Sequence, residues 1–333
     1  MLTTPLCNQL GIDHPILCVG MGTISGAGLA AAVSNAGALG VIGVARMPAT
    51  YTRNEIQRLR SMTSKPFAVN IILALLQEGQ VQACFDEHVP IIVFFWGDPA
   101  PYVSDAHRRG IKVLVQVGSV DEARRAASAG VDGIIAQGVE AGGHVRSSIS
   151  LSILLPSVVD AVSPLPVIAA GGIGNGRGIV MALSLGAQAV SMGTRFLCSK
   201  EARAASEYKD RVVRSHAEDT VLTPIFDGEW PNAPHRVLRN KAVTEWEAAG
   251  RPAPGQRPGE GSIIGTVPAR DGAAADVRRY STLWPIPGFI GDLEYVALYA
   301  GESCAFVQDI KPAAQIVSDL VQEAEAALQQ LRA

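Results

Sequence analysis

Short runs of β-branched and aliphatic residues recur along the first two hundred residues, and each is followed by an alanine-rich or amphipathic stretch. This alternation predicts βα units, because parallel strands covered by helices are apolar throughout whereas the covering helices are apolar on one side. The expected strands begin near Pro15, Leu39, Phe67, Ile91, Lys112, Gly133, Val167 and Ala189. Eight units that finish by about residue 195 favour an α/β fold with a closed (β/α)8 TIM barrel, and an open doubly wound sheet is the alternative.

The connection after the sixth expected strand is longer than the others. Most strands begin about 20 to 28 residues after the one before, but the seventh begins 34 residues after the sixth. The surplus lies between Gln137 and Ser150. Binding and catalytic residues concentrate in loops that a rigid scaffold positions. We therefore expect functional residues in this segment.

Beyond Arg195 the pattern changes. Residues 201–247 are charged and look helical, and the proline- and glycine-rich stretch 251–261 cannot continue a helix. An apolar-periodic helix is expected from about Pro312 to Leu331, packed on the barrel near the eighth strand. We predict a cofactor-binding barrel that consists of residues 1–200 and 300–333. Residues 201–299 then form a smaller C-terminal inserted region or lid on the substrate side.

The composition narrows the classes of function. Of 333 residues, 48% are hydrophobic and 34 are glycine, and the formal net charge is −3, so no basic surface for nucleic acid is expected. No apolar run approaches the roughly 18 residues of a membrane span, and the first residues lack the features of a signal peptide. We therefore expect a cytoplasmic protein without a membrane partner. The five cysteines form no CxxC pair and the histidines have no HExxH spacing, so neither disulfides nor a metal site are expected.

Two glycine-rich segments follow the seventh and eighth expected strands, where barrel enzymes usually hold phosphate. They are Gly171-Gly-Ile-Gly-Asn-Gly-Arg-Gly178 and Met192-Gly-Thr-Arg195. Glycine lets the backbone approach a ligand closely, and a helix that begins near Asn175 is expected to direct free N–H groups at an anion. Each loop alone reads equally well as a tight turn, with Asn175 as an N-cap. Together they favour a phosphate cradle, and no register of the first segment gives the G-x-G-x-x-G dinucleotide pattern.

Other strand ends carry groups that suit a flavin ring. The first strand runs into Gly20-Met-Gly22, and the third, fifth and sixth strands end at Asn70, Gln116 and Gln137. Small residues let a flat ring lie on the backbone, and amides donate to or accept from its polar edge. The alternative for Asn70 and Gln116 is a polar cap of a barrel strand.

The long loop contains Glu140-Ala-Gly-Gly-His144. A histidine has an unperturbed pKa near 6.5 and exchanges a proton at cellular pH, and the two preceding glycines let it fold over a bound ring. A lone loop histidine is more often simply solvated, but its place between the candidate cofactor groups favours a catalytic His144. Glu140 is expected to orient the loop rather than react.

These segments resemble the nitronate monooxygenases, formerly called 2-nitropropane dioxygenases, and the related FMN-dependent enoyl-acyl-carrier-protein reductases. The resemblance covers about residues 10 to 200, and its most specific piece is Gln137-Gly-Val-Glu-Ala-Gly-Gly-His144. It places His144 on the family's active-site histidine. With the glycine loops above, the residues expected to bind FMN are Met21, Gly22, Asn70, Gln137, Gly142, Gly171, Gly172, Ser191, Met192, Gly193 and Thr194.

Three details bear on the substrate. Gln137 favours the nitronate branch, since the enoyl reductases typically carry Glu there. Arg146, where many relatives have Gly near this position, would place a cation near the mouth of the site, and Ser191 replaces a frequent Gln. Tyr299, in Tyr295-x-x-x-Tyr299-Ala-Gly301, is similar to a family segment that reaches the substrate, although aromatic packing at helical spacing explains the pair equally well. His235 is not assigned to the site.

The resemblance implies an FMN-dependent oxidoreductase that oxidises alkyl nitronates with O2 to carbonyl compounds and nitrite, with nitroalkanes as a second candidate substrate class. His144 would act as the base towards a neutral nitroalkane or as a partner of the bound anion. The expected partners are therefore a small-molecule nitronate and O2, in a monomer or homodimer. One alternative is an NAD(P)H-dependent reductase of enoyl thioesters or quinones on the same scaffold. Another is a flavin-free barrel that binds or transforms a phosphorylated ligand.

Overall fold

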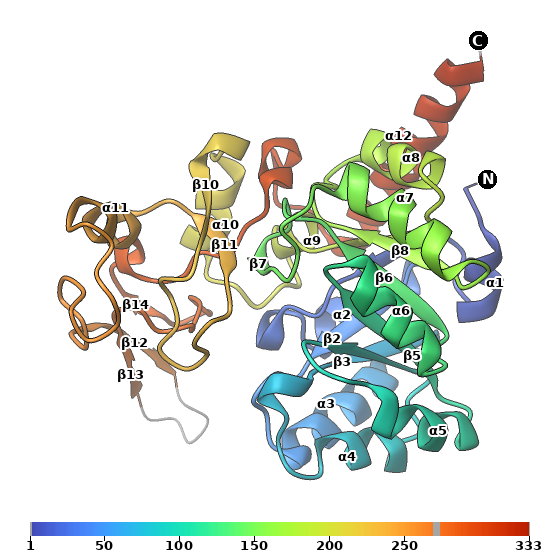
Figure 1. Cartoon of the computed structure of the whole chain (residues 1–333), viewed down its shortest axis with the longest axis horizontal. Helices are drawn as coiled ribbons and strands as arrows, with labels where there is room; N and C mark the ends of the chain where they lie inside the picture. The colour runs from blue at the N-terminus through green and yellow to red at the C-terminus, as the bar shows by residue number, and fades with distance from the viewer. Residues whose placement is uncertain (1, 269–273, 333) are drawn as a thin grey trace.

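Eight parallel strands form a closed barrel in the computed structural model, which describes residues 2–268 and 274–332 (Figure 1). In sheet order the strands run β1-β9-β8-β6-β5-β4-β3-β2. The Cys18 N–H donates to the Leu39 carbonyl at 3.0 Å and the Leu39 N–H to the Ile16 carbonyl at 2.9 Å, which joins the two ends of the sheet. The predicted TIM barrel is therefore confirmed. Its strands are β1 (Ile16–Cys18), β2 (Gly40–Gly43), β3 (Phe67–Ile72), β4 (Ile91–Phe95), β5 (Lys112–Val117), β6 (Gly133–Gln137), β8 (Val167–Ala170) and β9 (Ala189–Met192).

The barrel strands are buried on both faces because their side chains alternate between two apolar layers. Val41, Val93 and Leu114 point into the barrel, while neighbours such as Ile42 pack under the outer helices. Helix α1 (Pro5–Leu10) contributes apolar residues to the inner layer and so closes the bottom of the barrel. The outer helices are α2 (Ala27–Asn35), α3 (Ala49–Met62), α4 (Gln80–Asp86), α5 (Ala100–Arg108), α6 (Val120–Ser128), α7 (Leu151–Val162) and α8 (Gly176–Ser184). Short helices η1 (Gly22–Ile24), η2 (Leu73–Leu75) and α9 (Thr194–Leu197) follow β1, β3 and β9.

The overlong connection after β6 contains an extra two-residue strand, β7 (Gly143–His144). It pairs antiparallel with β11 (His235–Leu238), which also pairs with β10 (Thr220–Thr223). The charged segment 201–247, expected to be helical, is therefore only partly so. It forms α10 (Ser206–Val213), η3 (Ala217–Asp219) and α11 (Lys241–Ala248), and the β10–β11 hairpin lies between them. Strand β11 forms because His235 pairs with His144, which lies 91 residues away in the sequence. Local propensity contains no information about so distant a partner.

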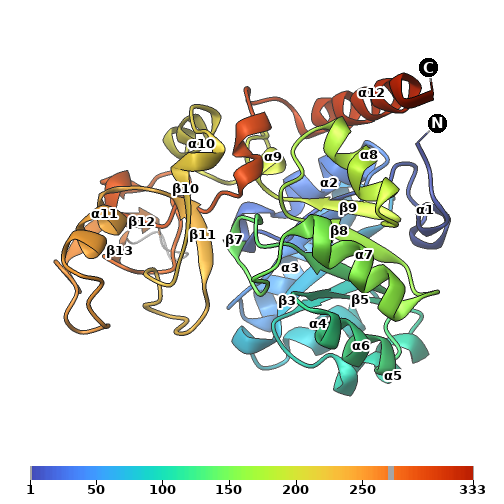
Figure 2. The ribbon, with the colours of Figure 1, turned by 45° about the horizontal axis from the view of Figure 1, so that its top comes forward.

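A second small sheet and the last helix complete the chain (Figure 2). The sheet has the order β13-β12-β14. The last helix, α12, packs against α8 and α2, close to the expected position. The five cysteines are buried and unpaired, and no described helix is long and apolar enough to cross a membrane. The remaining elements are β12 (Ile263–Pro268), β13 (Ala274–Arg278), β14 (Ile290–Gly291), η4 (Leu293–Tyr295), η5 (Glu302–Phe306) and α12 (Ala313–Arg332). The division at residues 201–299 stays a prediction.

Candidate active site

A cavity of about 680 Å³ lies at the carboxyl ends of the barrel strands, under the segments that follow β10 and β13. The eleven residues predicted to bind a cofactor all line it, although they come from six different strand ends and loops. His144 and Tyr299 line it as well, and so does Gln116. The fold therefore gathers the predicted residues at one place. Parallel strands make this arrangement possible, because their carboxyl ends all meet at one rim of the barrel.

Glycines shape the floor of this cavity. Gly171 and Gly172 follow β8 with φ of +100° and +70°, a conformation that disfavours any other residue. At Gly142 a Cβ would lie 2.3 Å from the backbone nitrogen of Gly301, so the loop and the segment after Tyr299 touch only because no side chain intervenes. The backbone itself thus forms the wall against which a ligand would lie.

The expectation about the helix after β8 is wrong. Asn175 is the N-cap of α8 and accepts from the Gly178 N–H at 2.9 Å, and the Gly176 N–H donates to the Glu323 carboxylate at 2.8 Å. A carboxylate from α12 thus takes the place at the helix N-terminus that an anion was expected to fill. Only the Gly171–Gly172 turn and the end of β9 remain as candidates for binding phosphate. The sequence could not reveal Glu323 as the partner, because it lies 147 residues away.

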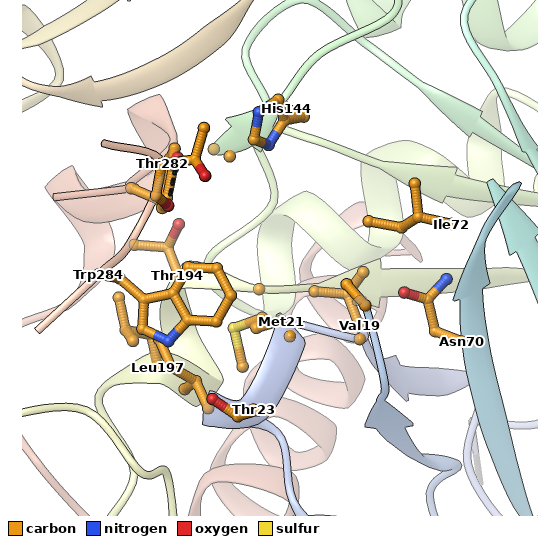
Figure 3. Close-up of a pocket in the computed structure, with 18 of the residues that line it drawn as sticks. Val19, Met21, Thr23, Asn70, Ile72, His144, Thr194, Leu197, Thr282 and Trp284 are labelled. Carbon is orange, nitrogen blue, oxygen red and sulfur yellow. Dashed lines mark hydrogen bonds between the residues drawn. The ribbon is translucent and has the colours of Figure 1, made fainter. Parts of the chain in front are cut away.

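Asn70 and Gly20 meet at the cavity edge. The Asn70 amide nitrogen donates to the Val93 carbonyl at 3.1 Å and fixes the side chain across the barrel rim. Its oxygen faces the cavity (Figure 3). A Cβ on Gly20 would lie 2.4 Å from the Asn70 Cβ, so the glycine is required for this close approach. Both interpretations of Asn70 from the sequence therefore apply. Its amide nitrogen links two strands, and its oxygen is an acceptor available to a ligand.

Gln137 holds the loop that carries the histidine. Its side-chain nitrogen donates to the His144 carbonyl at 2.9 Å, and its oxygen accepts from the Arg146 N–H at 3.1 Å. Both polar atoms thus bind the backbone on either side of Val145. Glu140 orients the same loop, as expected, by accepting from the Leu151 N–H at the start of α7 at 2.9 Å. Gln137 lines the cavity, but its polar groups act on the loop.

Arg146 does not line the cavity, contrary to the expectation of a cation at its mouth. Its guanidinium forms an ion pair with Glu122 of α6 and lies 4.8 Å from the centre of the Trp96 ring. These two partners hold the side chain on the outer surface. The cavity instead contains two arginines that the sequence did not single out, Arg46 after β2 and Arg203 after α9. Neither belongs to a motif, and only the folded chain brings them to the rim.

His144 lies in a box of aromatic rings. The Trp230 ring stacks on it with 4.1 Å between centroids, and Tyr299, Trp96 and His235 surround it at 5.5, 6.2 and 5.3 Å. Burial in this box is the largest cause that holds the pKa of His144 well below its ordinary value of 6.5, and the positive charge of Arg46 adds to it. The Nε2 atom is buried without a hydrogen-bond partner among the described residues. An unsatisfied buried nitrogen in a cavity wall is a place where a ligand is expected to bond.

His235 lies on β11, next to the His144 ring. It is fully buried, its Nδ1 lies 2.9 Å from the Ala233 carbonyl, and its Nε2 accepts from the Phe226 N–H at 3.2 Å. These two contacts require a neutral ring with the proton on Nδ1, and burial lowers its pKa from 6.5 to about 4. Sequence reasoning left His235 out of the site. Its role is structural, since it anchors β11 beside β7.

Tyr299 contributes to the box from an extended segment, not from a helix, so the helical-spacing explanation is wrong. Its backbone bridges to Val237 of β11, and its hydroxyl donates to the Thr282 carbonyl at 3.0 Å. Burial raises its pKa above the ordinary value of 10.0, so the phenol stays protonated. Tyr295 lies apart and bonds to Glu245. A neutral histidine, a protonated phenol and the Trp230 indole thus form a wall of low polarity beside the glycine floor.

Comparisons with known proteins agree with this geometry. A family model described as nitronate monooxygenase matches residues 3–80 and 73–323. The chain is 38% identical, over 75% of its length and 70% of the relative's, to a (3aS,4S,5R,7aS)-5-hydroxy-7a-methyl-1-oxo-octahydro-1H-indene-4-carboxyl-CoA dehydrogenase of Mycobacterium tuberculosis. Among solved structures, FabK of Thermotoga maritima is 33% identical with a TM-score of 0.80, covering 100% of this chain and 99% of that one. A nitroalkane oxidase of Streptomyces ansochromogenes is 28% identical with a TM-score of 0.78, covering 97% and 99%.

Proposed function

This chain belongs to the nitronate monooxygenase family, and from that premise we propose that it is an FMN-dependent enzyme that oxidises alkyl nitronates with O2 to carbonyl compounds and nitrite. One observation carries the proposal. The neutral, unpartnered His144 lies in a cavity that no Asp or Glu lines among the described residues, and Arg46 and Arg203 are its charged side chains. Such a wall favours an anion and rejects a cation.

The cavity fits a flavin phosphate and ring. The turn at Gly171–Gly172, with both glycines at positive φ, and the loop at Gly193–Thr194 are where the phosphate would bind. Asn70 would accept from the ring edge. When bound, FMN would supply the redox chemistry, taking electrons from the organic substrate and delivering them to O2. The protein contributes orientation, charge and exclusion of water.

His144 is the group that handles the proton. Because its pKa is well below 6.5, the imidazole is neutral at cellular pH, which is the protonation state that a base requires. Towards a neutral nitroalkane it acts as the base that removes the proton beside the nitro group. Towards a nitronate that is already formed, a proton on Nε2 lets it donate a hydrogen bond to a nitro oxygen. The stacked Trp230 ring keeps bulk water from the imidazole, so this bond is made in a medium of low polarity.

The proposal is tested by purifying the protein and recording its visible spectrum and its oxygen consumption with alkyl nitronates. We expect bound FMN, and oxygen uptake with release of nitrite in the presence of propyl nitronates. A colourless protein that takes up no FMN would contradict the flavin assignment and favour a flavin-free barrel. A flavoprotein that leaves nitronates unchanged would contradict the nitronate assignment only.

A second candidate is an NAD(P)H-dependent reductase of acyl thioesters or quinones. It is supported by two of the similar proteins, the indene-carboxyl-CoA dehydrogenase of Mycobacterium tuberculosis and FabK. The position of Gln137 also weakens the distinction between the branches, because both its polar atoms bind the loop backbone. Rapid bleaching of the flavin by NADH or NADPH, followed by reoxidation with an enoyl thioester or a quinone, is the result that would place this candidate first.

A further inference from the structure

A strap of residues 281–287 crosses the cavity between β13 and β14, and Trp284 is its largest side chain. The indole projects into the cavity and lines it (Figure 3). It lies against Gly22 so closely that a Cβ on that glycine would be 2.3 Å from the Trp284 Cη2. Gly22 has a φ of +51°, and it is one of the residues expected beside the flavin. Trp284 therefore fills space next to the loop that is predicted to bind the cofactor, although no sequence motif marks this residue.

Glu229 fixes this strap from a separate loop. Its carboxylate accepts from the Ser281 hydroxyl at 2.7 Å and from both the backbone N–H and the hydroxyl of Thr282 at 2.6 Å. Arg46 joins the same cluster from the barrel, donating to the Thr282 hydroxyl at 3.0 Å and to the Glu229 carbonyl at 2.7 Å. Charge-assisted bonds of this kind are stronger than neutral ones.

The strap has two further anchors. The Tyr299 hydroxyl donates to the Thr282 carbonyl, and the Ala205 N–H donates to the Pro285 carbonyl at 3.1 Å. Trp284 thus lies between fixed points on both sides, and it meets the edge of Tyr299 with 6.3 Å between ring centroids. An indole held this way leaves its position only if the strap itself moves. Its bulk is therefore a fixed boundary of the cavity.

Apolar side chains from other elements line the same cavity. Met47 and Leu75 line it from the barrel, and Val267 and Ile286 line it from the small sheet and the strap. We infer that Trp284 is a specificity-determining residue that limits the length of the apolar chain a substrate can carry, and that Glu229 is the positioning residue that keeps it there. The inference rests on the proposed function in that the substrate is taken to be an organic anion with an alkyl chain.

Straight-chain carboxylates test it without turnover, because they share the planar two-oxygen head and the alkyl chain of a nitronate. Binding of butanoate, hexanoate, octanoate and decanoate to the FMN-loaded protein is measured by titration calorimetry. In the unaltered protein we expect affinity to rise with chain length and then level off. In Trp284→Ala the rise should continue for at least two more methylenes, at about fourfold per methylene. Trp284→Phe should lie between the two, and it guards against a failure of the alanine variant to fold.

Trp246→Phe is the matched control, since Trp246 lies on α11, outside the cavity lining, and its indole donates to the Pro252 carbonyl. It should give the unaltered profile. Glu229→Gln should shift the profile in the same direction as Trp284→Ala but less, and should lower KM for long nitronates more than it changes kcat. If it lowers only the melting temperature, Glu229 has no positioning role.

A chain-length profile that is unchanged in Trp284→Ala and Trp284→Phe, at unaltered FMN content and melting temperature, would overturn the role of Trp284. The two hypotheses fail separately. Absence of nitronate turnover in the unaltered protein contradicts the proposed function, whereas the carboxylate titrations report on Trp284 alone.

Discussion

At the scale of single residues, the site depends on groups kept neutral by burial. His144 and His235 are both uncharged, and Tyr299 keeps its proton, so the charge in the cavity wall comes from arginine. Low polarity around His144 strengthens any hydrogen bond that its Nε2 makes to a ligand. A neutral base next to a cationic rim is suited to a carbon acid that becomes an anion when it loses its proton.

Removing the imidazole should separate the two roles of His144. For His144→Ala we expect kcat/KM with a neutral nitroalkane to fall by about 10²- to 10⁴-fold, the usual contribution of a positioned base. With a preformed nitronate the loss should be smaller, because no proton has to be removed. Oxygen uptake measures both, and FMN content checks that the cofactor stays bound. If the variant oxidises both substrates as fast as the unaltered protein while FMN stays bound, His144 has no role. His107→Ala, on the outer face of α5, is the control.

Burial of His235 predicts that stability falls in mild acid. Its pKa is about 4 in the folded protein against 6.5 when unfolded, so between these values the unfolded chain binds the extra proton. The free energy of unfolding should therefore be unaffected above pH 6.5 and should decrease as the pH falls from 6.5 to 4. The slope is ~1.4 kcal/mol per pH unit for one such group. Urea unfolding at several pH values measures the effect.

His235→Gln removes the titrating group and should flatten this part of the curve. His144 has the same sign of shift and adds to the slope, so the comparison is made in the variant as well as in the unaltered protein. An identical slope in both proteins would mean that His235 does not titrate in this range.

At the scale of elements, one short strand decides where the histidine lies. β7 has two residues, and it is held on one side by β11 and on the other by the side chain of Gln137. So short a strand has no stability of its own and exists because both neighbours supply hydrogen bonds. The β10–β11 hairpin therefore helps to build the candidate site, because it fixes the strand that carries His144.

Changing Gln137 should disturb this strand. A carboxylate in Gln137→Glu keeps an acceptor for the Arg146 N–H but cannot donate to the His144 carbonyl, and it places two acceptors face to face. We expect a loss of about 1–3 kcal/mol in unfolding free energy, since a buried carbonyl loses its donor. Turnover should fall, while FMN content stays the same. Urea unfolding and steady-state kinetics measure the two effects, and unchanged values in both would show that this hydrogen bond is dispensable.

At the scale of the whole molecule, the cavity is built from parts that are far apart in the chain. Its floor comes from the barrel loops, and its roof comes from the strap and the small sheet. A ligand that fills it touches both and should stabilise their arrangement.

We therefore expect FMN to raise the melting temperature of flavin-depleted protein. The gain in unfolding free energy should be about 2.7 kcal/mol at an FMN concentration one hundred times Kd. Scanning fluorimetry measures the shift, and riboflavin, which lacks the phosphate, is the control. If the two ligands stabilise the protein equally, the Gly171–Gly172 and Gly193–Thr194 loops do not bind phosphate.

The sequence by itself determined the barrel and most of its rim. Each strand is a local apolar run, and the glycines and amides at the strand ends occupy fixed places relative to those runs, so their convergence follows from the parallel arrangement. The hairpin β10–β11 was missed because its pairing with β7 is non-local. His144, which pairs with β11, was predicted as a site residue, but the aromatic rings around it were not.

Only the tertiary structure decided the charge and the shape of the cavity. Arg46 lines it and Arg146 does not, because Glu122 and Trp96 hold the latter outside. Glu323, from the last helix, fills the helix N-terminus that had been expected to bind an anion. Glu229 places Trp284 through a strap that no local pattern marks. In each case the interacting residues are separated in the sequence. Residues of the same type, such as two arginines, therefore acquire different surroundings only when the chain has folded.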